Sequence, residues 1–168
     1  MVLYGTQDAS ALSLLSYALE REHGLRSLPE IRRAERGKPY FPDLPEICFS
    51  WSHSGRYVLC ALSRRPVGVD LEIVRPRRET LPGYAFTGAE LAEYRAMGGG
   101  WPAFYTLWTR KEAWCKYTGD GLRASWGQTP PVDVLHYGAY TGPDWRAAVC
   151  GEEVPPAGIL WVDREVLP

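Results

Sequence analysis

Apolar residues recur at two different spacings along the first 75 residues, which separates one predicted helix from several predicted strands. Between Ala9 and Glu22 the apolar positions fall three or four residues apart, as on one face of an amphipathic helix. Asp8 or Ser10 can cap this helix, and Gly24 can end it. Shorter apolar runs predict strands over Met1–Gly5, Ile47–Ser52, Tyr57–Ser63 and Val67–Val74, with turns at Gly37-Lys38-Pro39, Ser54-Gly55 and Arg64-Arg65-Pro66.

The second half of the chain is predicted to hold two helices followed by short strands. Thr87 and Glu90 have the spacing of a capping box, so a helix is expected to begin there, after a loop up to residue 85, and to run to about Met97. Pro102 suits the first turn of a second helix, which should extend to Tyr117. Strand-like runs follow at Val132–Tyr140, Trp145–Cys150 and Ile159–Val162.

These elements predict an α+β fold made of two similar α+β halves. A helix and three strands are followed by two helices and three further strands, and no tandem repeat is visible. We expect an N-terminal subdomain over residues 1–75 and a C-terminal subdomain over residues 76–168, with their junction near Val74 to Leu81.

Composition narrows the class of protein. The 19 basic and 20 acidic side chains give a net charge of −1, so we expect no binding to nucleic acid through bulk positive charge. No stretch approaches a membrane-spanning length, and the first residues lack the pattern of a secretory signal, so a cytoplasmic protein without membrane attachment is expected. The four widely spaced cysteines form no CxxC pair, which argues against a zinc site or a disulfide framework.

The strand at Val67–Val74 carries the first candidate chemistry. Its apolar residues would line one face, while Gly68, Asp70 and Glu72 would share the other. The Cα atoms of the two acidic residues would be roughly 6.6 Å apart, so both carboxylates can reach one hard cation such as Mg²⁺ or Mn²⁺. The alternative is an exposed edge with two solvated acids.

The helix around residues 104–116 carries the second. Lys111 falls inside its apolar arc, where a charge is costly unless it has a partner. Glu112 and Lys116 lie four residues apart at the edge of that arc. Alternatives are a Lys111 side chain that snorkels to solvent, and an ordinary surface pair between Glu112 and Lys116.

Two shorter segments add candidate ligands for an anion. Ser52-His53-Ser54 lies at a strand end, where His53 can donate to a phosphate or simply occupy a turn. Pro39 favours an extended backbone at Lys38, which can project its ammonium toward a ligand or into solvent. A serine hydrolase is not supported, because no G-x-S-x-G segment is present.

In this order, four segments closely resemble the motifs of the 4'-phosphopantetheinyl transferases, of the monomeric type that activates surfactin synthetase. They are Gly37-Lys38-Pro39, Ser52-His53-Ser54, the strand Val67–Glu72 and the helix Trp108–Lys116. The resemblance extends from about Leu28 to Leu122. It implies two subdomains related by a pseudo-twofold axis, with coenzyme A in the cleft between them.

The resemblance also implies a reaction and a catalytic site. A holo-acyl-carrier-protein synthase of this type moves 4'-phosphopantetheine from coenzyme A to a serine of an apo acyl or peptidyl carrier protein, and releases 3',5'-ADP. Asp70, Glu72 and Glu112 would hold Mg²⁺, and Lys116 would face the pyrophosphate. Glu112 would also be able to accept the serine proton, so Glu112, Lys116 and His53 would form the catalytic set.

The coenzyme A contacts that we expect are Lys38, Pro39, Ser52, His53, Lys111 and Lys116. His53 would meet the 3'-phosphate, and Lys111 would face the cleft beside Glu112 or a phosphate. The first helix has no basic residue from Asp8 to Glu20, where the family often has one for the 3'-phosphate. The available substitutes are Arg26, Arg32, Arg33 and Arg36.

The implied protein partner is a carrier domain of a peptide, polyketide or fatty-acid synthase, in secondary metabolite biosynthesis, and the enzyme would act as a monomer. Arg75, Arg77 and Arg78 follow the acidic strand and could receive an acidic helix of the carrier. The alternatives are a non-catalytic homologue that only binds coenzyme A or a carrier protein, and a metal-dependent phosphodiesterase or nuclease.

Overall fold

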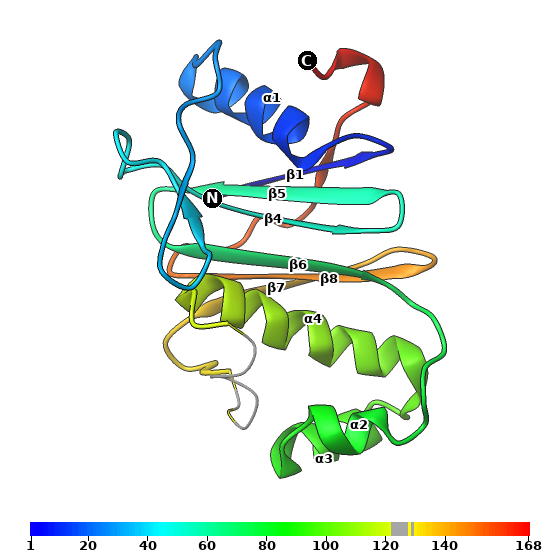
Figure 1. The fold of residues 1–168 in the computed structure, drawn as a ribbon. Helices are drawn as coiled ribbons and strands as arrows, with labels where there is room; N and C mark the ends of the chain where they lie inside the picture. The colour runs from blue at the N-terminus through cyan, green and yellow to red at the C-terminus, as the bar shows by residue number, and fades with distance from the viewer. Residues whose placement is uncertain (122–127, 129) are drawn as a thin grey trace.

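Two β-sheets lie face to face between two long helices in the computed structural model, which describes residues 1–121, 128 and 130–168 (Figure 1). From one side to the other, the layers are α1, a four-stranded sheet, a three-stranded sheet and α4. In chain order the helices and strands are β1 Val2–Gln7, α1 Ala11–His23, β2 Arg32–Arg33, β3 Pro39–Tyr40, β4 Cys48–Ser54, β5 Tyr57–Ser63, β6 Val67–Ile73, α2 Leu81–Ala85, α3 Gly88–Ala96, α4 Gly100–Thr118, β7 His136–Thr141, β8 Trp145–Gly151 and β9 Leu160–Trp161.

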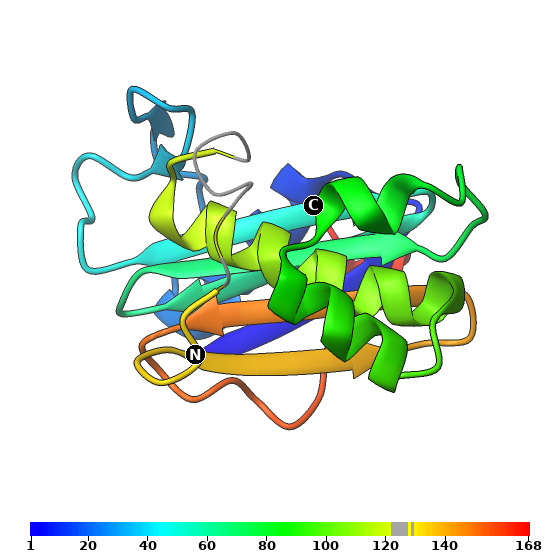
Figure 2. The same cartoon turned by 90° about the horizontal axis from the view of Figure 1, so that it is seen from below.

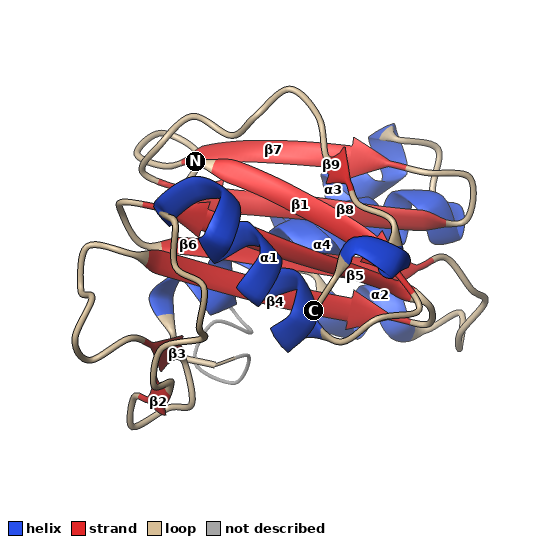
Figure 3. Ribbon diagram, turned by 90° about the horizontal axis from the view of Figure 1, so that it is seen from above, coloured by secondary structure: helices blue, strands red, loops and turns tan. Residues whose placement is uncertain are grey.

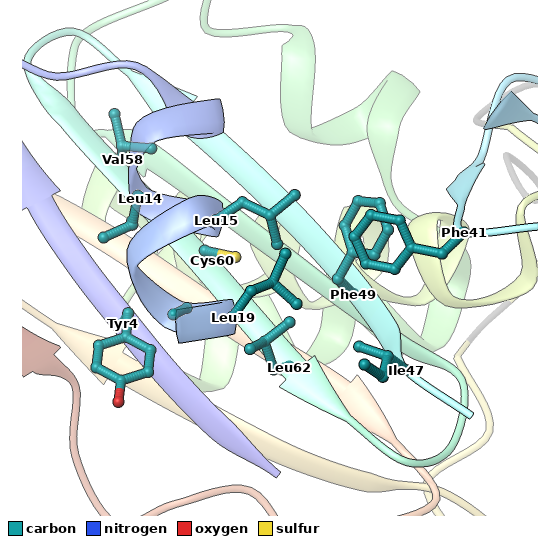
Figure 4. Packing of buried hydrophobic residues seen from close by; sticks show 11 residues of the cluster. Tyr4, Leu14, Leu15, Leu19, Phe41, Ile47, Phe49, Val58, Cys60 and Leu62 are labelled. Atoms are coloured by element: carbon teal, nitrogen blue, oxygen red, sulfur yellow. The ribbon is translucent and has the colours of Figure 1, made fainter. Parts of the chain in front are cut away.

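The outer face of the four-stranded sheet is covered by α1 (Figure 3). Strand order in this sheet is β4-β5-β1-β9, and β9 runs parallel to β1. Buried side chains of α1 pack against the sheet residues that face this helix and against Phe41, as Figure 4 shows. The helix is capped by the Ser10 side chain and ends at Gly24, whose φ of 68° is left-handed, so both predicted boundary residues are confirmed.

The three-stranded sheet has the order β6-β8-β7 and is antiparallel throughout. Its apolar face meets the four-stranded sheet in a second core, to which β6 contributes Val67, Val69 and Leu71. The predicted alternation along β6 is therefore confirmed. Since β9 pairs with β1 and β8 pairs with β6, each sheet combines strands from the first and the second half of the chain.

The opposite face of the three-stranded sheet carries α4, with α2 and α3 on its outer side (Figure 2). The capping box between Thr87 and Glu90 is present, and Phe86 and Leu91 pack in one apolar cluster. The short helix α2 lies where the sequence predicts a loop. Its five residues hold too few helical turns to produce a periodic pattern in the sequence.

The mixed α+β class is confirmed by this arrangement of sheets and helices. The pseudo-twofold relation and the boundary at residue 75 stay predictions, as does the end of the family resemblance at Leu122, which lies outside the described residues. Among the helices that the structure describes, none combines the length and the apolar character needed to cross a bilayer.

Candidate active site

Serine side chains of β4 accept hydrogen bonds from the backbone at the free edge of β6. Strand β6 is at the edge of its sheet, so its outward N–H groups have no neighbouring strand to accept them. The Ser50 and Ser54 hydroxyl oxygens accept these hydrogens, from Val69 N and Ile73 N, each at 3.1 Å. Because alternate residues of a strand share a face, the S-x-S-x-S pattern of β4 presents three hydroxyls to β6.

The same row of serines holds the two carboxylates of β6. Ser52 Oγ donates to Asp70 Oδ1 at 2.9 Å, and Ser54 Oγ donates to Glu72 Oε2 at 2.9 Å. Asp70 is only 3% exposed, so the alternative of a solvated acid is excluded at this position. Glu72 is half-buried. The acidic face of β6 therefore lies between β4 and α4, with its carboxylates held in place by hydrogen bonds from serines of β4.

Gly68 brings α4 into close contact with this acidic face. A Cβ atom built at Gly68 would lie 2.0 Å from the Ala113 carbonyl oxygen and 2.4 Å from Tyr117 N, both backbone atoms of α4. Only glycine allows this approach. One consequence is that Lys116 Nζ reaches β6, where it donates to Asp70 Oδ1 at 2.8 Å and contacts Ser52 Oγ at 2.9 Å.

Burial raises the pKa of all three carboxylates, and the charge of Asp70 adds to the effect at the other two. Burial raises the pKa of Asp70, and the Lys116 ammonium opposes that rise. Burial also raises the pKa of Glu72, and the charge of Asp70 adds to the effect. The pKa of Glu112 is raised to about 7, first by burial and next by the charge of Asp70. This concentration of negative charge in a partly buried site is typical of a place that binds a cation.

The donor set fits a hard cation, although its side chains are not gathered around one point. Among the described residues, no three Asp, Glu, His or Cys side chains are already arranged to hold a metal ion. Asp70 Oδ2 is nevertheless buried without a hydrogen-bond partner from those residues, while Oδ1 is held by Ser52 and Lys116. An unpartnered buried carboxylate oxygen is costly, and a bound cation would satisfy it.

A pocket of about 270 Å³ opens beside Glu112 and Lys116. We call it the nucleotide-side pocket; its other walls are Arg33, Arg36, Gly37, Lys38, Pro39, Phe49, Ser50, Trp51, Cys115, Gly119 and Gly121. Arg33 and Arg36, which the sequence offers as substitutes for the missing N-terminal bases, both lie here. The small β2–β3 hairpin presents them, with Gly37 at a φ of 92° in its turn.

A second pocket, of about 360 Å³, begins on the other side of Glu112. We call it the acceptor-side pocket; its walls are Glu72, Arg77, Arg78, Leu81, Phe104, Tyr105, Trp108 and Glu112. Arg77 Nε donates to the Tyr105 hydroxyl at 3.2 Å, which ties the segment before α2 to α4. Glu112 thus borders both pockets, and no hydrogen bond to its carboxylate is found among the described residues.

The expected coenzyme A contacts are distributed unevenly. Lys38, Pro39 and Lys116 line the nucleotide-side pocket, and Ser52 is joined to it through Lys116. The Lys38 ammonium donates to the Tyr117 and Val67 carbonyl oxygens, and burial lowers its pKa, so mainly its stem is available to a ligand. His53 is exposed near the end of β4 and is not among the described residues of either pocket.

Lys111 is where the structure departs from the expected site. Its position in the buried arc of α4 is confirmed, but its ammonium bonds to Glu90 at 2.8 Å and not to Glu112 or an open pocket. The physical reason is that α3 covers this part of α4 and supplies a carboxylate there, which a local pattern could not show. The role of Ser50 and the pairing of Glu90 with Lys111 were missed, although the capping role of Glu90 was predicted. For Ser50, the serine alternation along β4 was an available signal.

Comparison with known proteins finds similarity to one enzyme family. Residues 66–142 match the model of the 4'-phosphopantetheinyl transferase superfamily, a segment that includes Asp70, Glu72, Glu112 and Lys116. The chain is 39% identical over 90 residues to the 4'-phosphopantetheinyl transferase Sfp of Bacillus subtilis, covering 52% of this chain and 40% of that protein.

Two enterobacterial relatives match over longer segments. A 4'-phosphopantetheinyl transferase of Escherichia coli strain K12 is 41% identical over 103 residues, covering 58% of this chain and 52% of the relative. One of Salmonella typhimurium is 34% identical over 124 residues, covering 71% of this chain and 65% of the relative. The matched segments thus span from 40% to 65% of the lengths of these relatives.

Proposed function

Since this chain belongs to the 4'-phosphopantetheinyl transferase superfamily, we propose that it transfers 4'-phosphopantetheine from coenzyme A to a serine of an apo acyl or peptidyl carrier protein. The observation that carries the proposal is the buried Asp70 carboxylate. One of its oxygens is held by Lys116 and Ser52, and the other has no partner among the described residues. Asp70 lies within the segment that matches the family model.

Asp70, Glu72 and Glu112 are the residues that would hold Mg²⁺, with Mn²⁺ as the substitute, because their donors are all carboxylate oxygens. A bound divalent cation would orient the pyrophosphate and stabilise negative charge on its leaving oxygen. Burial raises the pKa of all three acids, and the charge of Asp70 adds to the rise at Glu72 and Glu112, which supports a site that a cation would stabilise. The side chains of Glu72 and Glu112 would have to draw closer to Asp70 around the ion.

In the transfer step, the serine Oγ of the carrier forms a bond to the phosphorus that bears pantetheine. The bond from that phosphorus to the bridging oxygen of the pyrophosphate breaks, and 3',5'-ADP leaves with the electron pair. Glu112 borders both pockets, and its carboxylate accepts the serine proton, directly or through water. Lys116 supplies positive charge to the pyrophosphate as negative charge develops there.

Coenzyme A would occupy the nucleotide-side pocket. Arg33 adds positive charge at its rim, as does Arg36, which is ion-paired with Asp120 at 2.6 Å, and the stem of Lys38 with Pro39 forms its wall. His53 is proposed to meet the 3'-phosphate from the exposed end of β4. Lys111 has no place in this contact set, because its ammonium is already bound to Glu90.

The carrier protein would approach from the acceptor-side pocket. Arg77 and Arg78 line this pocket, and Arg75 precedes them in the chain; all three are exposed, so they can attract an acidic segment next to the serine. Aromatic side chains of α4, Phe104, Tyr105 and Trp108, offer apolar contact area inside the pocket. In this proposal the two substrates approach Glu112 from its two neighbouring pockets, which is compatible with the serine oxygen and the leaving oxygen lying on opposite sides of the phosphorus.

The decisive experiment is mass spectrometry of an apo carrier protein after incubation with this protein, coenzyme A and Mg²⁺. A carrier that gains the mass of one phosphopantetheine group, with release of 3',5'-ADP, supports the proposal. Binding of coenzyme A without any mass gain on a panel of carriers would instead indicate a non-catalytic homologue. Cleavage of coenzyme A in the absence of a carrier would indicate a phosphodiesterase.

A further inference from the structure

Lys111 and Glu90 form an ion pair that is almost completely shielded from water. The Lys111 side chain is 0% exposed and that of Glu90 is 2% exposed, and Nζ lies 2.8 Å from Glu90 Oε2. The same ammonium donates to the Ala85 carbonyl oxygen at 3.1 Å. Since Ala85 is the last residue of α2 and Glu90 lies in the first turn of α3, Lys111 of α4 bonds to both helices at their junction.

Glu90 performs a second task with the same oxygen. Its Oε2 accepts from the backbone N–H of Thr87 at 2.7 Å, and the Thr87 hydroxyl accepts from Glu90 N at 3.4 Å. The capping box that begins α3 therefore shares its carboxylate with Lys111. As a result, the start of α3 and the buried charge on α4 are held in one fixed geometry.

A buried ion pair of this kind contributes more to fixing the relative position of the helices than to the free energy of unfolding. Removing two charges from water costs energy that their attraction does not always repay, and apolar residues of similar size often serve as well. The Lys111–Glu90 pair differs from apolar packing because it has a single hydrogen-bonded arrangement. It fixes how α2 and α3 sit on α4, whereas the surrounding apolar cluster of Ala85, Phe86 and Phe104 supplies non-directional contact.

Of the helices that Lys111 joins, α2 and α4 line the acceptor-side pocket, whereas none of its described lining residues comes from α3. Leu81, the first residue of α2, and the preceding Arg77 and Arg78 form one wall, and residues of α4 form the other. The wall is attached near its start by the Arg77–Tyr105 hydrogen bond and at the end of α2 by Lys111. The nucleotide-side pocket has no described lining residue from α2 or α3.

We propose that Lys111 and Glu90 are positioning residues that set the width and orientation of the acceptor-side pocket, without touching either substrate. The expected effect on catalysis rests on the proposed function, because it assumes that the carrier serine enters the acceptor-side pocket. Lys111 directly precedes Glu112 on α4. The helical turn that carries the Glu112 carboxylate is therefore also the turn to which α2 and α3 are bonded. Loosening this bond should therefore affect the carrier and spare coenzyme A.

The test uses the full chain with K111M, E90Q and the double variant K111M/E90Q. Each single change leaves one buried charge without its partner and should lower the melting temperature. The double variant removes both charges, while the glutamine oxygen can still accept from Thr87 N, so its melting temperature should recover toward wild type. At that recovered stability, its KM for carrier protein should remain about tenfold higher, because a displaced wall loses contacts to the carrier equivalent to about 1.4 kcal/mol of binding.

A matched control is R110M, which breaks an ion pair between the same two helices. Arg110 of α4 forms a two-pronged pair with Glu93 of α3, at 2.9 and 2.6 Å, but both side chains are partly exposed. Exposed pairs contribute little, so R110M should leave the melting temperature and both KM values near wild type. A double variant with wild-type KM for the carrier would overturn the proposal, as would an equal rise in the KM for coenzyme A.

Hydrogen exchange separates failure of this proposal from failure of the proposed function. In K111M, amides of residues 81–96 should exchange faster than in wild type, while those of α1 and β5 should not change. This readout needs no substrate. Unchanged exchange over residues 81–96 would overturn the positioning role even if transfer occurs, whereas a wild-type protein that never modifies a carrier would contradict the proposed function alone.

Discussion

The pockets on the two sides of Glu112 are walled by different kinds of structure. On the nucleotide side, the walls are β4, the β2–β3 hairpin and the last turns of α4. The close backbone contact at Gly68 and hydrogen bonds from the backbone of β6 to short serine side chains of β4 hold β4, β6 and α4 together. On the acceptor side, the walls are α2 and the first half of α4, joined by side-chain contacts. Backbone contacts leave little freedom, whereas a few polar side chains between helices define a wall that single substitutions can shift.

The difference suggests a division of labour. A fixed pocket suits the proposed donor, coenzyme A, which would be the same molecule in every reaction. A pocket closed by the α2–α3 unit suits a protein partner, whose surface varies from one carrier to another. If this comparison is right, substitutions should separate into those that disable the shared centre, those that affect coenzyme A and those that affect the carrier.

The largest effect is expected from D70N, which disables the shared centre. Loss of the carboxylate should reduce transfer by at least about a hundredfold, because charge stabilisation at the pyrophosphate is lost. The raised pKa of Asp70 means that its charged form is disfavoured by burial, so the melting temperature without Mg²⁺ should be unchanged or higher. Transfer assays and thermal unfolding with and without Mg²⁺ measure both effects. Wild-type activity of D70N at saturating Mg²⁺ would contradict the metal assignment.

The next effect is expected from G68A, which should disturb both pockets at once. The new methyl group would meet backbone atoms of α4, so the helix must shift, at a cost of about 1–3 kcal/mol in the free energy of unfolding. Both KM values should rise, since α4 borders both pockets. The control is G83A in α2, where an added Cβ has no neighbour within 4 Å. Equal stability of G68A and G83A in denaturant titrations would show that the close contact is unimportant.

A smaller and one-sided effect is expected from R33A combined with R36A. Both arginines line the nucleotide-side pocket, so their loss should raise the KM for coenzyme A and leave that for the carrier unchanged. Steady-state kinetics with each substrate varied in turn would measure the split. Dephospho-coenzyme A, which lacks the 3'-phosphate, provides the control, because the variant should discriminate less between the two forms if these arginines bind that phosphate.

The mirror-image effect is expected from replacing Arg75, Arg77 and Arg78 with alanine. The KM for the carrier should rise and lose part of its salt dependence, because the net charge of −1 gives no global attraction to an acidic partner. The KM for coenzyme A should hardly change. A parallel rise in both KM values would assign these arginines to the nucleotide and remove the contrast between the pockets.

The smallest effect concerns pH. Below about pH 7 the Glu112 carboxyl holds a proton that a cation must displace, so affinity for Mg²⁺ should fall as the pH drops through 7. Calorimetric titration of the protein with Mg²⁺ alone, in buffers of different ionisation enthalpy, would report both affinity and proton release. Equal affinity on both sides of pH 7 would exclude Glu112 as a ligand with this pKa.

Local patterns determined most of the individual elements. The apolar spacing, the serine cap and the closing glycine of α1 are contained within one short stretch, and so is the capping box of α3. The acidic alternation of β6 and the order of Asp70, Glu72, Glu112 and Lys116 could likewise be found by position in the chain. These features depend on neighbouring residues, whose relative placement the backbone geometry already sets.

Only the tertiary structure decided which of these groups meet. Ser52 lies 18 residues from Asp70, and Lys116 lies 46 residues from it, so their hydrogen bonds depend on how β4, β6 and α4 pack. Lys111 is the clearest example: the sequence places a charge inside an apolar arc, but its partner comes from Glu90, 21 residues away on another helix. A buried charge must find a partner wherever packing supplies one, and no local pattern encodes that choice.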